Sequence, residues 1–339
     1  MNIASLIMAV LGVCACSDAL NCIRCQKATC PDITCSGSKI PDECGCCDVC
    51  AKQENESCGG PWDSAGICDT GLACVTTETE VSSSNKPTRL LVLAMPFDQS
   101  TGKCKTSYRD CNEVCDNTTT ITNQPTGFTF YGREAMFIDE NTGRGFRAYC
   151  DCSSGKNRAW TVIQRRSSNK VSFDKTWEEY EKGFGTPLED YWLGLHRLHT
   201  MTDKQPYEMK INIRFKKSYK TTANFGLTAI LYHSRIVIIG SRETSYQMIL
   251  GLNTGKLSNA FMRVHNGMKF STKDNDNDNW SGGNCAKWFG GGWWFNSCTE
   301  QNLNGVYYPN SPGPDRITWG GDTSPDIEMI EMKIRPLVY

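Results

Sequence analysis

The sequence of 339 residues lacks most of the patterns from which a function can be inferred directly. After the N-terminal segment no stretch is apolar enough to span a membrane, so no membrane span is expected. The net charge of −1 gives no electrostatic reason to expect a nucleic-acid partner. Heptad runs and Gly-X-Y tracts are also missing, and any homo-oligomer must therefore form through the surfaces of folded domains.

Catalytic motifs are missing as well. The sequence contains no G-x-S-x-G, no H-E-x-x-H and no glycine-rich phosphate loop. Only four histidines occur, namely His196, His199, His233 and His265. The first two share the segment L-H-R-L-H, but no third metal ligand accompanies them. The chain is therefore predicted not to be an enzyme.

The N-terminus has the features of a secretory signal peptide. MNIASLIMAVLGVCAC is a short uncharged apolar run followed by small residues. Cleavage after Ser17 removes Cys14 and Cys16 from a total of 20 cysteines and leaves an even number, as disulfide pairing requires. We therefore predict a signal peptide at residues 1–17 and a secreted, extracellular protein. Sequons begin at Asn55, Asn117 and Asn279, and the first two are predicted glycosylation sites.

Cysteine dominates the first part of the mature chain. Residues 22–74 contain eleven cysteines with few large apolar residues between them. A segment with so little material for a core can fold only if cross-links restrict its unfolded state. Zinc is the alternative, because Cys22-x-x-Cys25 and Cys47-x-x-Cys50 have the spacing of zinc ligands. An oxidising compartment favours disulfides.

The run ECGCCDVCAKQENESCGGPWDSAGICDTGLAC resembles the N-terminal module of insulin-like-growth-factor-binding proteins. That module uses twelve cysteines, the number found from Cys22 to Cys104, and we assign it to residues 18–105. Glu43 departs from the motif, which usually has Gly there. The segment KPTRLLVLAMPF is interpreted either as an internal strand or as an apolar patch for a growth-factor-like protein. The resemblance assigns hormone contact to positions matching Pro87, Leu90, Leu91 and Leu93.

Beyond Cys111 the composition indicates a large domain, mainly of β structure. EMKINIRF alternates apolar and polar residues with a period of two, as a half-buried strand does. FDKTWEEYEKGFG has the pattern of a short helix that ends at Gly. Nine tryptophans in the whole chain supply material for a substantial core.

An ordered series of motifs in this half resembles the fibrinogen C-terminal globular domain. The motifs are AWTVIQRR, SFDKTWEEYEKGFG, YWLGL, FSTKDNDND, NCAKWFGGGWWFNSC, NLNGVYY and MKIRP. Arg158 and Ala159 depart from the usual glycines before the first motif. The resemblance covers residues 106–339 and implies an α+β fold, a mainly antiparallel β domain preceded by the small disulfide-rich module.

Six cysteines remain outside the N-terminal module. The family resemblance implies the pairs Cys111–Cys150 and Cys285–Cys298. Cys115 and Cys152 are additions to the family pattern, and pairing them makes a second link between the same two segments.

An oxygen-rich tract contains Asp274-x-Asp276-x-Asp278. An EF-hand is excluded because its sixth position is Asn279 rather than Gly and its twelfth is Cys285 rather than Glu. Without the resemblance, the default interpretation is a solvated turn. The fibrinogen-domain resemblance implies Ca²⁺ instead, with ligands from the side chains of Asp276 and Asp278 and the carbonyls of Trp280 and Gly282. The spacing from Asp278 to Cys285 is one residue longer than the usual family pattern.

The aromatic tract that follows has two interpretations. Its tryptophans and phenylalanines can be core residues, and this is the expectation for Trp293. In lectin-like members of the family the corresponding pocket binds acetyl groups of N-acetylated sugars, beside a cis peptide bond. The matching positions, predicted to bind a ligand, are Phe289, Trp294, Asn296, Ser297, Cys298 and Thr299. Thr299 replaces a His of many acetyl binders, and Gly313 replaces an aromatic wall residue.

Two classes of function follow. The first hypothesis is a calcium-dependent, lectin-like recognition protein that binds acetylated carbohydrate on microbial surfaces, in innate immunity. The alternative is a protein-binding matrix or signalling module that engages a growth factor or a receptor.

Overall fold

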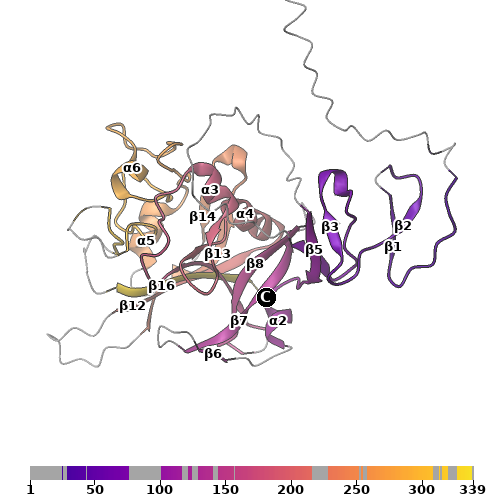
Figure 1. Cartoon of the computed structure of the whole chain (residues 1–339). Coiled ribbons are helices and arrows are strands. Elements are labelled where there is room, and N and C mark those ends of the chain that lie inside the picture. The colour runs from indigo at the N-terminus through magenta and orange to yellow at the C-terminus, as the bar shows by residue number, and fades with distance from the viewer. Residues whose placement is uncertain are drawn as a thin grey trace, which may run out of the picture. The chain divides into compact units, whose positions relative to one another are not determined.

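The computed structural model describes residues 25, 29–42, 44–75, 101–116, 121–123, 129–139, 144–155, 157–215, 228–251, 253–254, 258–307, 313, 315–319 and 327–337. It divides into two compact units, residues 1–106 and 107–339 (Figure 1). The predicted signal peptide, the segment with Pro87 and Leu90, and the sequon at Asn117 lie outside the described residues. Asn55 lies exposed in a turn.

The smaller unit is built from very short strands. β1 (Lys39–Pro41) pairs with β2 (Asp48–Cys50), and β5 (Thr101–Thr106) pairs with both β3 (Ser57–Gly59) and β4 (Leu72–Val75). A single 3-10 turn, η2 (Pro61–Asp63), follows β3. The buried apolar residues of the smaller unit are Ala51, Cys58, Ala73 and Cys104. With side chains this small, burial of apolar surface contributes little and the cross-links must hold the unit together.

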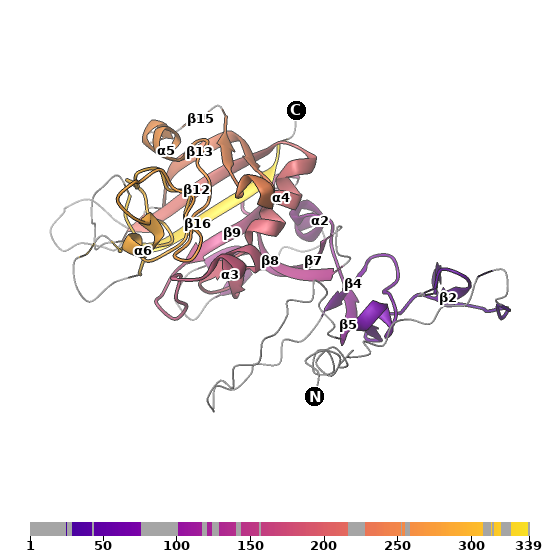
Figure 2. The same ribbon diagram turned by 90° about the horizontal axis from the view of Figure 1, so that it is seen from above.

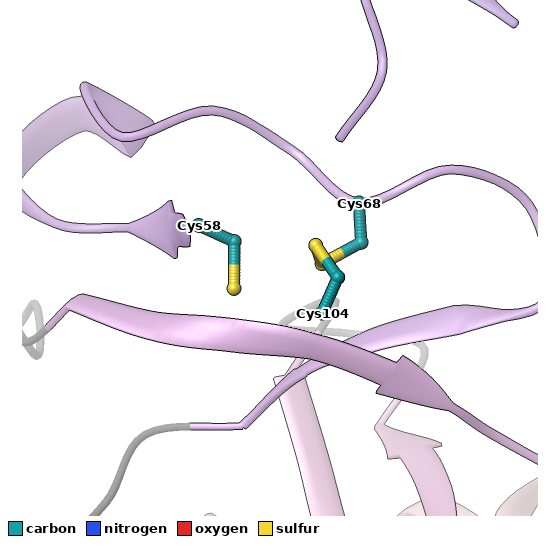
Figure 3. Close-up of side chains that lie close together, drawn as sticks. All are labelled: Cys58, Cys68 and Cys104. Carbon is teal, nitrogen blue, oxygen red and sulfur yellow. A yellow bond between two sulfur atoms is a disulfide. The ribbon is translucent and has the colours of Figure 1, made fainter. Parts of the chain in front are cut away.

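Disulfides account for the cysteine pairs that have zinc-ligand spacing. The pairs are Cys25–Cys46, Cys30–Cys47, Cys35–Cys50, Cys58–Cys74 and Cys68–Cys104. Figure 3 shows Cys58 close to the bonded pair Cys68 and Cys104. The three sulfurs lie within 4.8 Å of one another. These sulfurs belong to two neighbouring bridges and are not free thiolates, the form in which cysteine binds zinc. The zinc alternative is therefore wrong for Cys25, Cys47 and Cys50.

The larger unit is an antiparallel sheet in the order β14-β13-β12-β16-β9-β8-β7-β6. Its strands are β6 (Ile121–Asn123), β7 (Thr129–Asp139), β8 (Arg144–Asp151), β9 (Trp160–Arg166), β12 (Tyr207–Phe215), β13 (Thr228–Ile239), β14 (Met248–Leu250) and the C-terminal β16 (Ile327–Pro336). Short strands β10 (Phe184–Gly185), β11 (Tyr191–Trp192) and β15 (Asn253–Thr254) pair at its margins. The predicted mainly antiparallel fold with a disulfide-rich module is confirmed.

Helices are short and few among the described residues. They are α2 (Cys111–Asp116), α3 (Trp177–Lys182), α4 (Leu195–Lys204), α5 (Ser258–His265), α6 (Cys285–Phe289) and the 3-10 turn η3 (Arg242–Thr244). In α3, Thr176 and Glu179 form a reciprocal capping box. Gly183 ends the helix at φ 92°, where a Cβ would meet the Leu193 carbonyl oxygen at 2.4 Å. None of the described helices is long and apolar enough to cross a membrane.

Alternation along β12 separates the two faces of the sheet. Met209, Ile211 and Ile213 are buried in the apolar core, and Glu208 and Lys210 project from the opposite face. The core side is aromatic: the Trp192 ring lies 5.5 Å from Tyr180 of α3 and 6.1 Å from Trp294. α4 is fixed to β13, where the Ile239 N–H donates to the Thr202 hydroxyl at 3.0 Å.

The opposite face contains two buried ion pairs, one between the adjacent strands β9 and β16 and one that reaches from β16 past β9 to β8. Arg165 of β9 pairs with Glu331 of β16 at 2.7 Å, and Lys333 pairs with Asp151 of β8. The Lys333 ammonium is the main charge that lowers the Asp151 carboxyl pKa, against the opposing effect of burial. Two disulfides, Cys111–Cys150 and Cys115–Cys152, tie α2 to β8 and to the residue that follows it.

Candidate functional site

The acidic loop between α5 and α6 is organised around Asp278. Its Oδ1 accepts the Trp280 N–H at 2.8 Å, and its Oδ2 accepts the Cys285 N–H at 2.8 Å. Asp276 lies beside it, with Oδ1 at 3.4 Å from the Asp278 backbone N. Burial, opposed by these N–H donors and assisted by the Asp276 carboxylate, raises the Asp278 carboxyl pKa above its ordinary value. The loop thus holds two carboxylates close together.

The third aspartate of the tract has a different role. Asp274 accepts the Trp177 N–H at 2.9 Å and the Thr272 hydroxyl at 2.7 Å. It therefore fastens the loop to the first turn of α3. The family resemblance did not include Asp274 among the predicted calcium ligands.

The backbone near Asp278 supplies further oxygens. The Trp280 carbonyl closes a turn by accepting the Gly283 N–H at 3.4 Å, and Gly282 is exposed. A Cβ on Gly282 would meet the Trp280 Nε1 at 2.7 Å, so glycine lets the chain pass close to this indole. Two carboxylates and nearby carbonyls are the donor types that Ca²⁺ prefers, and these residues fit such an ion.

The aromatic tract is mostly core. Trp294, predicted to line a ligand pocket, is 1% exposed. Its Nε1 donates to the Tyr246 carbonyl at 2.8 Å, and its ring meets Phe270 edge-on at 5.0 Å. The prediction for Trp294 is wrong because the indole is enclosed on all sides by residues from distant parts of the chain. Trp293 is also fully buried, as expected.

Phe289, Asn296, Ser297 and Cys298 lie on the segment that the Cys285–Cys298 disulfide closes, and Thr299 follows it directly. Phe289 is half-buried, with its ring 5.8 Å from that of Phe295. The Ser297–Cys298 peptide bond is cis.

Internal hydrogen bonds engage polar groups of Asn296 and Thr299. The Asn296 N–H donates to the Cys298 carbonyl at 2.8 Å, and the Asn296 carbonyl accepts the Asn279 N–H at 3.0 Å. The Thr299 hydroxyl donates to the Gln301 carbonyl at 2.7 Å. A Cβ at Gly313 would lie 2.6 Å from Asp315 Oδ1, so no aromatic wall stands there.

Sequence reasoning missed the most exposed large apolar side chain of the described residues. Trp288 is 59% exposed, and its ring lies 6.3 Å from that of Trp280, edge to face. Asn284 caps the N-terminus of α6, where its Oδ1 accepts the Lys287 N–H at 2.9 Å. Cys285 and Ala286 are buried while Lys287 and Trp288 face outward. The helix is too short for its sequence pattern to have indicated this exposure.

All four histidines have partners within the fold. His196 lies 3.5 Å from the Asp139 carboxylate, whose hydrogen bond raises the His196 pKa. His199 Nδ1 lies 2.9 Å from the Ile239 carbonyl, and His233 pairs with Glu208. The buried His265 lies between the Trp294 carbonyl at 2.8 Å and the Gln301 side chain at 3.1 Å. Burial lowers its pKa to about 4.

Comparison with known proteins assigns both units. Residues 107–337 match the C-terminal globular domain of fibrinogen beta and gamma chains, and residues 22–74 match insulin-like growth factor binding protein. Neither is a family of enzymes. Among solved structures, the fibrinogen-like globe domain of human ANGPTL2 covers 68% of this chain and 100% of its own, with a TM-score of 0.56 and 29% identity.

Curated relatives give a consistent picture. Human angiopoietin-related protein 7 is 37% identical over 193 residues, which are 56% of this chain and 52% of the relative. Human angiopoietin-2 is 34% identical over 236 residues, 68% and 43% of the two chains. Human fibrinogen-like protein 1 is 33% identical over 254 residues, 68% and 73%. The chain spans about half the length of the first of these relatives.

The lectin hypothesis is wrong on this evidence. These relatives are angiopoietins, angiopoietin-related proteins and fibrinogen-like proteins rather than lectins. The structure supplies a physical reason, since Trp294 offers no surface to an acetyl group and the Thr299 hydroxyl is engaged internally. The hypothesis that the protein recognises acetylated glycans in innate immunity is therefore wrong. The protein-binding alternative agrees better with the relatives.

Proposed function

The chain belongs to the family of proteins with the C-terminal globular domain of the fibrinogen beta and gamma chains, and from this premise we propose that it is a secreted protein that binds another protein, a receptor or a growth factor. The disulfide-rich composition and the angiopoietin and angiopoietin-related relatives support an extracellular place of action. The binding surface that we propose is the outward face of α6 and the Trp280 loop beside it.

Exposed Trp288 is the observation that carries this proposal. Exposing a large indole to water has a free-energy cost that association removes, and tryptophan is enriched among the residues that dominate interface energies. The backbone beneath it is held by the Cys285–Cys298 bridge and by the Asp278 carboxylate at the start of α6. A rigid aromatic anchor loses little conformational entropy on binding.

The N-terminal module offers a second surface for a growth-factor-like partner. Val49 of β2 and Ile67 are among the exposed large apolar side chains of the described residues. The match of residues 22–74 to insulin-like growth factor binding protein supports a peptide-hormone partner at this module. The two surfaces are on separate compact units and can be tested separately.

Trp288→Ala is expected to weaken binding of the partner by about 2 kcal/mol or more, roughly thirtyfold, without lowering the melting temperature. The measurement is surface plasmon resonance of the full chain against a panel of secreted growth factors and receptor ectodomains. Val49→Ala serves as the matched variant for the N-terminal module, and Ile249→Ala as an exposed apolar residue outside both surfaces. Partners that bind the Trp288 variant and the native chain equally well would contradict the proposed surface.

We further propose that the acidic loop binds Ca²⁺ through Asp276 and Asp278, with backbone carbonyls such as those of Trp280 and Gly282. Two neighbouring carboxylates, one of them partly buried, repel each other unless a cation lies between them. Binding would stiffen the loop that leads into α6, and so would support the Trp288 surface. In this proposal the ion has a structural role, because it neutralises the charges of the Asp276 and Asp278 carboxylates.

Calcium is expected to raise the melting temperature of metal-stripped native protein, because binding to the folded state alone stabilises it by about 2.7 kcal/mol at a hundredfold excess over Kd. Asp276→Asn should abolish this rise, since it removes a charged ligand whose Oδ1 lies 3.4 Å from the Asp278 backbone N. Asp274→Asn is the control and should retain the rise, because Asp274 is engaged by Trp177 and Thr272. The measurement compares melting temperatures in EDTA and in millimolar calcium. An equal calcium-dependent rise in the Asp276 and Asp274 variants would count against the site.

A further inference from the structure

A cavity of about 230 Å³ lies within the larger unit, away from α6 and the acidic loop. Residues of α2, β7, α4 and β12 line it. Figure 2 shows where these elements lie in the larger unit. The disulfide between Cys111 and Cys150 fixes α2 at one side of it, and the hydroxyl of Thr161 donates to the Cys111 sulfur at 3.2 Å. Nothing in the proposed protein-binding function uses this cavity.

One part of the cavity wall is apolar and aromatic. Phe137 of β7 and Phe146 of β8 stack with ring centroids 5.6 Å apart and an angle of 29° between their planes. Met201 of α4 and Tyr207 of β12 also line it. An apolar cavity of about 150 Å³ is known to bind benzene. The larger volume here therefore suits a flat apolar body about the size of naphthalene.

Three cationic and two anionic side chains line the cavity, and the cation of Arg109 also pairs with Glu113 at 3.7 Å. Arg109, Arg197 and Lys204 contribute cationic side chains, against the carboxylates of Asp110 and Asp139. Both carboxylates have local partners, since Asp110 accepts the Glu113 N–H at 3.0 Å and Asp139 lies 3.5 Å from His196. Cations at the rim of an apolar cavity favour a ligand whose charged end is an anion.

Arg197 connects the charged rim to the apolar interior. Its guanidinium carbon lies 5.1 Å from the centroid of the Phe146 ring, and one guanidinium nitrogen, Nη1, donates to the carbonyls of Lys182 at 2.8 Å and Leu193 at 2.9 Å. These contacts hold the cation beside the aromatic wall, and its planar fork suits a carboxylate.

From these observations we propose that the cavity binds a small amphipathic anion, a flat apolar body with one carboxylate directed toward Arg197 and Lys204. The apolar part packs on Phe137 and Phe146, and the carboxylate remains at the positively charged rim. The class of ligand is thus an aromatic or similarly compact hydrophobic carboxylic acid. This site is independent of the protein-binding surface at α6.

The test measures binding of naphthalene-2-carboxylate to the full chain by isothermal titration calorimetry. The neutral naphthalene-2-carboxamide has nearly the same shape and is expected to bind about tenfold more weakly, because it lacks the charge. Lys204→Gln should weaken carboxylate binding several-fold and leave carboxamide binding unchanged. Lys170→Gln is the matched control, since Lys170 is exposed and does not line the cavity.

Occupancy of the cavity itself is tested by Met201→Trp, which adds volume inside it. Both probes should then fail to bind while the melting temperature stays close to that of the native chain. Absence of carboxylate binding by the native chain at millimolar concentration would overturn the proposal. Equal affinity of the native chain for the two probes would show that the cations do not contribute to binding. Unchanged binding by the Met201 variant would show that the probe binds outside the cavity. Either result refutes the proposed site. If Met201→Trp lowers the melting temperature, the Lys204 series alone decides.

Discussion

Glu331→Ala is expected to lower the free energy of unfolding by about 3–5 kcal/mol, because it leaves a buried guanidinium without its counter-ion. Arg165 is fully buried. Its Nε and Nη2 donate hydrogen bonds to Glu331 Oε1 at 2.9 Å and 2.7 Å. The two residues face each other in the β9–β16 register at the centre of the sheet. The Arg165 guanidinium also lies 4.4 Å from the centroid of the Tyr149 ring. Alanine at position 331 cannot replace the lost charge.

Urea unfolding followed by tryptophan fluorescence measures this effect. The matched control is Glu189→Ala, which breaks the ion pair between Lys170 and Glu189 at 3.1 Å. Those side chains are 67% and 50% exposed, so the control should cost less than about 1 kcal/mol. A loss of similar size in both variants would show that burial of the Arg165 pair does not set its energetic importance.

Acidification from pH 6.5 to pH 4 is expected to destabilise the native chain through His265 by about 3 kcal/mol. Burial lowers the pKa of this imidazole to about 4, below the ordinary value of 6.5 that it has in the unfolded chain. The unfolded state therefore binds a proton that the folded state does not between these two values. The contribution of His265 is fully present above pH 6.5 and is lost as the pH falls through this interval.

His265→Asn isolates the effect, since asparagine does not titrate and can still donate to the Trp294 carbonyl. The difference in unfolding free energy between the native chain and the variant should shrink by about 3 kcal/mol between pH 7 and pH 4. His196 works in the opposite sense, because its hydrogen bond to Asp139 raises its pKa and it stabilises the fold at low pH. His196 is present in both chains and cancels in the difference. A difference that does not change with pH would mean that His265 is not buried in neutral form.

The sequence by itself determined the fold class and much of the local structure. Ordered motifs such as AWTVIQRR and YWLGL indicated the fibrinogen-type domain, and residues 107–337 match that family. The alternation in EMKINIRF correctly predicted that Met209, Ile211 and Ile213 of β12 are buried. Local patterns succeed in these cases because strand periodicity and helix caps depend on neighbours within a few residues.

The sequence could not decide which tryptophan of the aromatic tract faces water. Trp288 and Trp294 are six positions apart in one glycine-rich segment, yet the first is exposed and the second is in the core. Gly290, at φ 65°, ends α6 and redirects the chain between them. The prediction of a lectin-type pocket from the family resemblance was therefore wrong about Trp294. The lectin function itself is contradicted by the relatives of this chain.

Only the tertiary structure decided the environments of Trp294, Arg165 and His265. The Trp294 indole is enclosed by Tyr246 and Phe270, and the buried partner of Arg165 is 166 positions away along the chain. Burial, ion pairing and the pKa of a side chain depend on which distant segments pack around it. That arrangement is set by the joint packing of the sheet and its loops, and no short stretch of sequence specifies it.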